Sequence, residues 1–275
     1  MKKINNKNKR IVIKFGTENL FNDNEKLDQS VFDDFARQIV SVQSLGIQVV
    51  VVSSGAIATG TERLSSLRIN PQEFTKKELA GIGARHLLNR WGSAFEKYDR
   101  EVGQVLVTYA NWEEPNERQN VKTSILNYVR LDIIPIINEN DVVSDTEIKL
   151  MEKGISENDR LARMVTELVD ADSILFLTNV SGVFENNPKI YPEARLYTEV
   201  DHRTANDRVK VDSCVTSQKG RGGMSAKLKE AIICAQMGKN AVIAGREENV
   251  IIKFAKGEPV GTHVGESMRF VSRSF

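Results

Sequence analysis

The chain has 275 residues, of which 40% are hydrophobic and 27% are charged, and its formal net charge is +1. This length suffices for one large α/β domain or two small ones. The nearly balanced charge gives no general electrostatic reason to expect a nucleic acid or a membrane surface as partner. The two cysteines, Cys214 and Cys234, have no partner at metal-binding spacing. The sequence therefore predicts neither a zinc site nor a disulfide framework, and it favours a reducing, cytoplasmic setting.

Short runs rich in β-branched residues alternate along the chain with longer helical patterns. The six expected strands, in chain order, are Ile11–Phe15, Gln48–Val52, Gln104–Thr108, Ile133–Ile137, Ser173–Thr178 and Asn240–Ala244. The expected helices are Asp28–Leu45, Ala56–Leu67, Lys76–Tyr98, Asn116–Arg130, Asn158–Val169 and Ser225–Met237. Most of the strands are apolar at nearly every position, which is typical of parallel strands covered by helices on both faces. The pattern predicts an α/β fold built from parallel βα units.

Two segments interrupt this alternation. Gly182–Leu196 contains Asn-Asn-Pro and Tyr-Pro, which predict a turn or hairpin excursion. Gly261–Ser274 alternates loosely between polar and apolar residues, and it predicts a terminal hairpin at a sheet edge. Because ligands of open α/β sheets bind beyond the carboxyl ends of the strands, the functional residues are expected in the loops that follow the strands.

The loops after the first two expected strands have features of anion sites. Lys14 ends the first strand and Gly16 follows, which places a cation beside backbone that an anion can approach closely. Ser54-Gly55-Ala56 leads from the second strand directly into a helix, whose free N–H groups can bind a carboxylate or phosphate. A surface lysine before an ordinary turn and a capped, tightly packed helix explain the same residues without a ligand.

The fourth expected strand is followed by four polar residues, Asn138-Glu139-Asn140-Asp141. A structural turn rarely needs four consecutive amide and acid groups, whereas the ammonium of an amino acid needs acceptors of this kind at a fixed strand end. A second polar group, Ser156-Glu157-Asn158-Asp159, opens the next helix. Helix capping and favourable acidic charge in the first turn also account for that group.

A glycine-rich loop, residues 220–227, precedes the last expected helix. Its three glycines can expose N–H groups to phosphate oxygens, and Lys227 falls in the first helical turn near the same place. The spacing matches neither the Walker A loop nor the dinucleotide-binding GxGxxG motif. The loop therefore indicates phosphate binding without P-loop or Rossmann chemistry.

In their order and identity, these segments resemble the amino acid kinase superfamily and, within it, the glutamate 5-kinase family, over about residues 10–245. The segments that carry the resemblance are Val12–Thr17, Ser53–Gly60, Ile134–Asp141, Asn158–Leu161 and Gly222–Leu228. The Asn-Glu-Asn-Asp sequence is the most specific to glutamate 5-kinases, whereas the first and last of these segments are shared more widely across the superfamily.

The resemblance implies a three-layer αβα sandwich with an open, mainly parallel sheet. Glutamate is expected over the first half, about residues 10–170, and MgATP over the second, residues 171–275. The implied reaction is attack of the γ-carboxylate on the γ-phosphate to give glutamyl 5-phosphate, the first step of proline biosynthesis. A glutamate side chain, with a reference pKa of about 4.3, is already an anion at pH 7, so this nucleophile needs no general base.

The resemblance also implies which residues form the site. Lys14 and Lys227 are expected to reach the transferred phosphoryl group from opposite halves, with Asp159 between them. The implied substrate-binding positions are Ser54, Gly55, Ala56, Asn138, Asp141 and Asn158. The implied nucleotide-binding positions are Lys14, Gly16, Thr178, Asn179, Arg221, Gly222, Gly223, Met224, Ser225, Ala226 and Lys227. Mg²⁺ is expected on the phosphate oxygens, with no metal site made by the protein alone.

Several positions depart from the family pattern. Asn179 stands where an aspartate is usual, Arg221 and Ala226 replace threonines, and Gly83-Ala84-Arg85 replaces Gly-Gln. The stretch between Asp141 and Asn158 is a few residues longer than is typical. These departures leave open the contacts to the nucleotide, strict glutamate specificity and regulation by proline.

The expected organisation is a basic lead-in, residues 1–9, followed by a single kinase domain over residues 10–275, without the additional RNA-binding-like domain of many family members. By resemblance the chain is expected to form a homo-oligomer, a dimer or tetramer. One alternative is a related kinase that acts on another carboxylate or a carbamate. A second is a regulatory protein that binds a nucleotide or an amino acid and has lost its activity.

Overall fold

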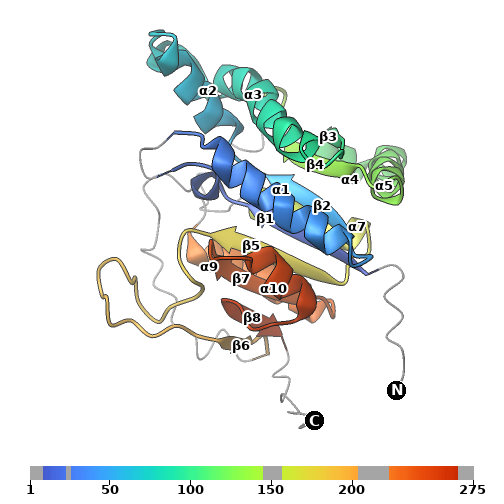
Figure 1. Cartoon of the computed structure of the whole chain (residues 1–275), viewed down its shortest axis with the longest axis vertical. Coiled ribbons are helices and arrows are strands. Elements are labelled where there is room, and N and C mark those ends of the chain that lie inside the picture. Colours follow the sequence, from blue (N-terminus) through green and yellow to red (C-terminus); the bar gives the residue numbers. More distant parts are fainter. Residues whose placement is uncertain (1–8, 23–25, 145–156, 204–222, 266–275) are drawn as a thin grey trace.

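The computed structural model describes residues 9–22, 26–144, 157–203 and 223–265. Its strands form one eight-stranded sheet in the order β3-β4-β2-β1-β5-β7-β8-β6 (Figure 1). The strands are β1 (Arg10–Phe15), β2 (Gln48–Ser53), β3 (Val102–Val107), β4 (Ile134–Glu139), β5 (Ser173–Thr178), β6 (Glu199–Asp201), β7 (Asn240–Gly245) and β8 (Thr262–Gly265). The β7–β8 pair is antiparallel, and the other pairs described are parallel. The predicted α/β fold with a mainly parallel sheet is confirmed.

The six expected helices are present, with ends that differ by a few residues. They are α1 (Gln29–Gln43), α2 (Ala56–Ser66), α3 (Lys76–Glu96), α5 (Pro115–Arg130), α7 (Glu157–Leu168) and α9 (Met224–Gln236). The sequence did not predict α4 (Tyr109–Glu113), α10 (Val250–Lys256) or the 3₁₀ turns η1 (Thr17–Asn19) and η2 (Pro71–Glu73). These elements are too short for a helical period to stand out from neighbouring turns. Among the described residues, no helix is long and apolar enough to cross a membrane.

Both faces of the sheet are covered, and each has its own apolar core. Ile11, Ile13 and Phe15 of β1 point to the face covered by α1, α3 and α10, where Trp91 and four phenylalanines, Phe15 among them, form ring contacts. Val12 points to the opposite face, covered by α5, α7 and α9. Because side chains alternate along a strand, Lys14 lies on the same face as Val12. This register directs the lysine toward α7.

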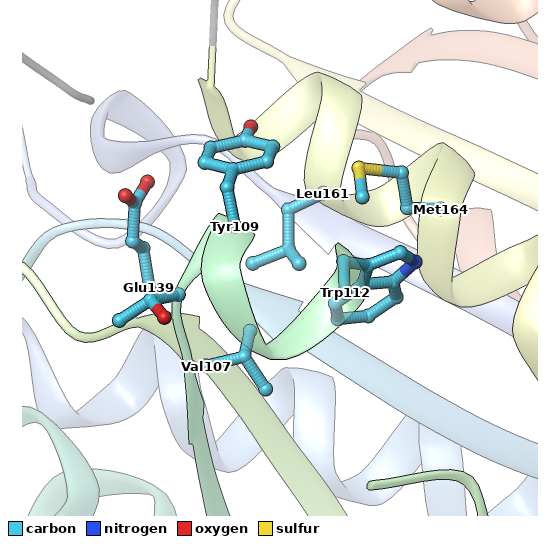
Figure 2. Close-up of a pocket in the computed structure, with 7 residues that line it drawn as sticks. Val107, Tyr109, Trp112, Glu139, Leu161 and Met164 are labelled. Carbon is cyan, nitrogen blue, oxygen red and sulfur yellow. The ribbon is translucent and has the colours of Figure 1, made fainter. Parts of the chain in front are cut away.

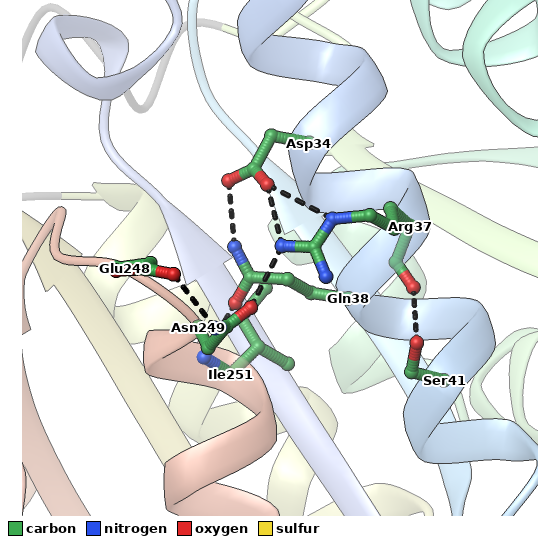
Figure 3. Close-up of polar contacts among 7 residues, drawn as sticks. All are labelled: Asp34, Arg37, Gln38, Ser41, Glu248, Asn249 and Ile251. Carbon is green, nitrogen blue, oxygen red and sulfur yellow. Dashed lines mark hydrogen bonds and ion pairs between the residues drawn. The ribbon is translucent and has the colours of Figure 1, made fainter.

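A polar network joins α1 to α10 across the first of these faces (Figure 3). The fully buried Gln38 donates to Asp34 Oδ2 at 2.7 Å and accepts the Ile251 N–H at 2.9 Å. Arg37 donates to Asn249 Oδ1 at 2.8 Å. Ile251 lies in the first turn of α10, where a backbone N–H has no partner within the helix. Gln38 therefore supplies the acceptor that the start of α10 requires.

The predictions for the two segments that interrupt the alternation, Gly182–Leu196 and Gly261–Ser274, compare differently with the structure. An isolated antiparallel bridge joins Phe184 to Leu196, which confirms the predicted excursion between these residues. The predicted terminal hairpin is represented by β8, which lies beside β7 within the sheet. β6 occupies the sheet edge next to β8 and was not predicted. The remainder of the predicted hairpin, residues 266–274, lies outside the described residues.

Candidate active site

Two lysines and one aspartate meet at the carboxyl end of β1. Lys14 Nζ lies 2.7 Å from Asp159 Oδ1, and Lys227 Nζ lies 3.2 Å from Asp159 Oδ2. Lys14 comes from β1, Asp159 from the first turn of α7 and Lys227 from the first turn of α9. At most 6% of any of the three side chains is exposed. The structure thus brings together three residues separated by up to 213 positions in the sequence.

This cluster carries one more positive than negative charge in a place largely removed from water. Burial lowers the pKa of Lys14, and the Lys227 ammonium adds to this, while Asp159 opposes both effects. Burial acts in the same direction on Lys227, but the carboxylates of Asp159 and Glu18 outweigh it and raise the pKa of Lys227. Two buried ammonium groups that share one carboxylate are suited to receive an anion.

The start of α2 lies beside this cluster and presents backbone N–H groups. Ser54 follows β2 and is held by its own N–H, which donates to the Phe15 carbonyl at 3.1 Å. Gly55 takes the N-cap position with φ of 112°, a left-handed conformation that favours glycine, and no side chain caps the helix. The first N–H groups of α2 are therefore open to an anionic ligand.

Close contact with α3 fixes the position of α2. A Cβ placed on Gly60 would lie 2.0 Å from the Leu79 carbonyl oxygen, and one on Gly83 would lie 1.8 Å from the Ala56 carbonyl oxygen. Only glycine fits at either crossing point. α3 also contacts the end of β2, because Trp91 donates a hydrogen bond to Ser53 Oγ at 3.1 Å. α2, whose first N–H groups form the candidate anion site, is thus packed closely against α3.

The polar segment after β4 lies at the same edge of the sheet. Asn138 and Glu139 are buried, and the Ser144 hydroxyl donates a hydrogen bond to the Glu139 carboxylate. The side-chain oxygens of Asn138 and of Asn158 are buried and make no hydrogen bond among the described residues. A buried acceptor without a donor is costly, which makes both oxygens candidates to accept a hydrogen bond from a ligand. Asp141 follows in the turn after the strand.

A small pocket lies between α4, α7 and the ends of β3 and β4 (Figure 2). Its lining residues are Val107, Thr108, Tyr109, Trp112, Glu139, Leu161 and Met164. Figure 2 shows the Tyr109 ring and the Glu139 side chain extending in the same direction, with α7 beside them. The Arg160 guanidinium lies over the Tyr109 ring, 4.6 Å from its centroid. The sequence did not single out Tyr109 or Arg160.

The second half of the chain contributes the ends of β5 and the start of α9. Thr178 is buried at the end of β5, and Asn179 follows it. Gly223 is the N-cap residue of α9 and, as a glycine, offers no side-chain acceptor to the first N–H groups of that helix. Met224, Ser225 and Ala226 lie in the first turn of α9. Arg221 and Gly222 lie outside the described residues.

The loop between β1 and η1 completes the site. Gly16 lies two residues after Lys14, and the Glu18 carboxylate folds back over it, with both oxygens 3.0 Å from the place that a Gly16 Cβ would occupy. Its negative charge acts on both Lys14 and Lys227. No role for Glu18 was predicted from the sequence, although Glu18 stands two residues after Gly16.

Two lysines around an aspartate, two uncapped helix ends and an open parallel sheet are the features of a phosphotransferase site without a P-loop. The sequence model of the amino acid kinase family matches residues 9–245. The chain therefore belongs to the amino acid kinase family, and among its curated relatives it belongs with the glutamate 5-kinases.

The relatives are moderately similar over most of the chain. The glutamate 5-kinase of Dehalococcoides mccartyi (strain 195) is 37% identical over 261 residues, which cover 94% of this chain and 69% of that protein. The glutamate 5-kinase of Pasteurella multocida is 35% identical over 255 residues, which cover 92% of this chain and 68% of that protein. The identity is well above the level at which only the fold is shared.

Solved structures resemble the fold at lower identity. A carbamate kinase from Giardia lamblia bound to AMP-PNP gives a TM-score of 0.66 at 16% identity and covers 95% of this chain and 99% of its own. A UMP kinase from Bacillus anthracis gives a TM-score of 0.61 at 19% identity and covers 94% of this chain and 97% of its own. These two proteins support the architecture of the sheet and its helices.

Proposed function

We propose that this chain transfers the γ-phosphoryl group of ATP to the γ-carboxylate of L-glutamate and so forms glutamyl 5-phosphate, the first step of proline biosynthesis. The observation that carries the proposal is the buried Lys14–Asp159–Lys227 cluster, found in a member of the glutamate 5-kinase family. Transfer between two anions requires cations that are fixed in advance, because charge spreads over the transferring group in the transition state.

The proposed reaction uses the cluster as an electrostatic clamp. A γ-carboxylate oxygen of glutamate forms a bond to the γ-phosphorus as the bond to the bridging oxygen of ADP breaks, and ADP leaves with that electron pair. Lys14 approaches the phosphoryl group from β1 and Lys227 from α9, while Asp159 holds both ammonium groups in place. By analogy with deleted oxyanion-hole donors, each lysine contributes on the order of 3–4 kcal/mol to the transition state.

The acceptor is proposed to lie over the ends of β2 and β4. The open N–H groups at Gly55 and Ala56, together with Ser54, would bind its reacting carboxylate. The oxygens of Asn138 and Asn158 and the carboxylate of Asp141 would accept hydrogen bonds from its ammonium. The nucleotide would lie over Thr178, Asn179 and the start of α9, with residues 221–227 around its phosphates.

Mg²⁺ is proposed to accompany ATP and to be bound mainly by phosphate oxygens, where it neutralises phosphate charge. Among the described residues, no group of three or more histidine, cysteine, aspartate or glutamate side chains is arranged to hold a metal ion. We also propose that the protein acts in the cytoplasm and that it forms a homo-oligomer. Light scattering of the purified chain tests the oligomeric state.

Incubation with MgATP, L-glutamate and hydroxylamine tests the proposed reaction, because an acyl phosphate is trapped as a hydroxamate. We expect hydroxamate and ADP in equal amounts, and loss of both in Lys227→Ala. Turnover of another acid or a carbamate, with none of L-glutamate, would refute the substrate assignment. A folded protein that binds ATP and phosphorylates no acceptor would instead support a regulatory role.

A further inference from the structure

The side chain of Arg160 reaches from α7 to α4. This residue follows Asp159 in the first turn of α7, but its guanidinium extends to the Tyr109 ring, 4.6 Å from the centroid. Tyr109 opens α4 directly after β3 and lines the same pocket as Glu139 from the end of β4 (Figure 2). Asp159 therefore faces the lysine cluster at β1, whereas its neighbour reaches toward the ends of β3 and β4.

The guanidinium of Arg160 is held in place without an acidic partner. Among the described residues it makes no ion pair or hydrogen bond, whereas Arg163, less than one turn later, binds Glu230 at 2.6 Å and Glu167 at 3.6 Å. A cation in the first turn of a helix also lies at the positive end of the helix dipole, which opposes it. Stacking on Tyr109 thus fixes a guanidinium with five N–H donors, for which the described residues supply no acceptor.

The proposed acceptor supplies the anion that this guanidinium lacks. L-Glutamate has two carboxylates, and the reacting one is proposed to lie at the start of α2, after β2 and beside the lysine cluster. Adjacent strands lie about 4.8 Å apart, and β4 is the neighbour of β2 in the sheet. An extended acceptor directed along this order carries its second carboxylate toward β4 while its ammonium reaches Asn138 and Asp141. A planar guanidinium binds a carboxylate through two parallel hydrogen bonds.

We propose that Arg160 binds the α-carboxylate of the acceptor and makes the site selective for a dicarboxylic amino acid. This proposal rests on the proposed function, because it assumes that the γ-carboxylate reacts at the lysines. Glutamate and 4-aminobutyrate share the reacting carboxylate, the chain and the ammonium, and they differ by the α-carboxylate alone. Preference for glutamate over 4-aminobutyrate therefore measures the contribution of the group that binds the α-carboxylate.

The test compares kcat/KM for the two acceptors, by ADP release, in the wild-type protein, Arg160→Gln, Arg160→Lys and the control Arg163→Gln. We expect Arg160→Gln to raise KM for L-glutamate by about 10- to 100-fold, with kcat, KM for ATP and the rate with 4-aminobutyrate little changed. Arg160→Lys should lose part of the preference, because it keeps the charge without the planar fork. Arg163→Gln should keep the wild-type preference even if its melting temperature falls.

The outcomes separate this assignment from the proposed function. Wild-type preference retained in Arg160→Gln, with a wild-type melting temperature, would overturn the role of Arg160 and leave the kinase activity standing. A higher KM for ATP in place of glutamate would also overturn it, because the guanidinium would then bind the nucleotide. A wild-type protein that phosphorylates neither acceptor would overturn the proposed function and this assignment together.

Discussion

Replacement of Gly83 in α3 by alanine should displace the start of α2 and so disturb the proposed acceptor site. The added Cβ would lie 1.8 Å from the Ala56 carbonyl oxygen and 2.5 Å from the Gly60 backbone nitrogen, whereas real Cβ atoms keep at least 3.0 Å. Because both neighbours are backbone atoms, no side chain can move aside, and α2 and α3 must separate by roughly the missing 1.2 Å (3.0 minus 1.8). Overpacking of this kind costs about 1–3 kcal/mol of folding stability.

The displaced element is the start of α2, whose N–H groups are proposed to bind the reacting carboxylate. A misplacement of about 1 Å can reduce a rate by about 100-fold, so we expect kcat/KM for L-glutamate to fall by that order while KM for ATP stays near its wild-type value. Urea unfolding measures the loss of stability, and ADP release measures the loss of rate.

Gly92→Ala is the matched control, because Gly92 lies in the same helix and its added Cβ would meet Val102 Cγ2 at an ordinary 3.8 Å. We expect it to leave the rate unchanged and to raise stability by up to about 1 kcal/mol, since alanine favours a helix. Equal stability and equal kcat/KM in Gly83→Ala and Gly92→Ala would refute the view that contact with α3 positions the anion site.

Three further predictions concern the Lys14–Asp159–Lys227 cluster and the hydrogen bond between Gln38 and Ile251. Asp159→Asn leaves the ammonium groups of Lys14 and Lys227 without a shared carboxylate. We expect the free energy of unfolding, measured in urea, to fall by about 3–5 kcal/mol and kcat to fall below 1% of wild type. A wild-type kcat would contradict this. Because burial lowers the pKa of Lys14 and its charged form is required, kcat measured by ADP release should fall as pH rises toward 10.5, the ordinary lysine value. The contribution of Lys14 to stability should not fall with it, because the unfolded chain binds that proton more tightly, whereas Lys227, whose pKa is raised, acts in the opposite direction. A flat rate up to pH 10.5 would count against a charged Lys14. Gln38→Leu removes the acceptor of the buried Ile251 N–H. We expect the free energy of unfolding, measured in urea, to fall by about 1–3 kcal/mol, with kcat little changed in the folded fraction. Undiminished stability would show that this N–H finds another acceptor.

The strands and the position of Lys14 were within reach of sequence reasoning. Buried parallel strands are apolar at nearly every position, so β1, β2, β4 and β5 stand out from their surroundings. By contrast α10 has seven residues and β6 three, and neither is long enough to establish a period. Their places depend on contacts with distant segments, such as the bond from Ile251 to Gln38, that no local pattern records.

The candidate site also combines features that the sequence predicts with features that depend on distant contacts. Lys14 and Lys227 were expected on opposite sides of Asp159 by family resemblance, since no spacing rule relates residues so far apart in the sequence. Gly83 illustrates what the residues alone do not reveal: a glycine within a helix pattern predicts only a small loss of helix stability until the partner helix is known. Arg160 lies in Asn158–Leu161, a segment that carries the family resemblance, but the sequence assigned it no role because the contact with Tyr109 joins residues far apart in the chain.

The contacts between helices around the candidate site also bear on how the two proposed ligands are aligned with each other. On one face of β1, Gln38 and Arg37 join α1 of the first half to α10 of the second. On the other face, Asp159 joins α7 to α9 through Lys227, and a buried pair between Arg163 and Glu230 joins the same helices further along. Both halves are therefore tied across the strand that carries Lys14. These contacts support the proposal that Lys14 and Lys227 are fixed in advance, as preorganised charge stabilisation requires.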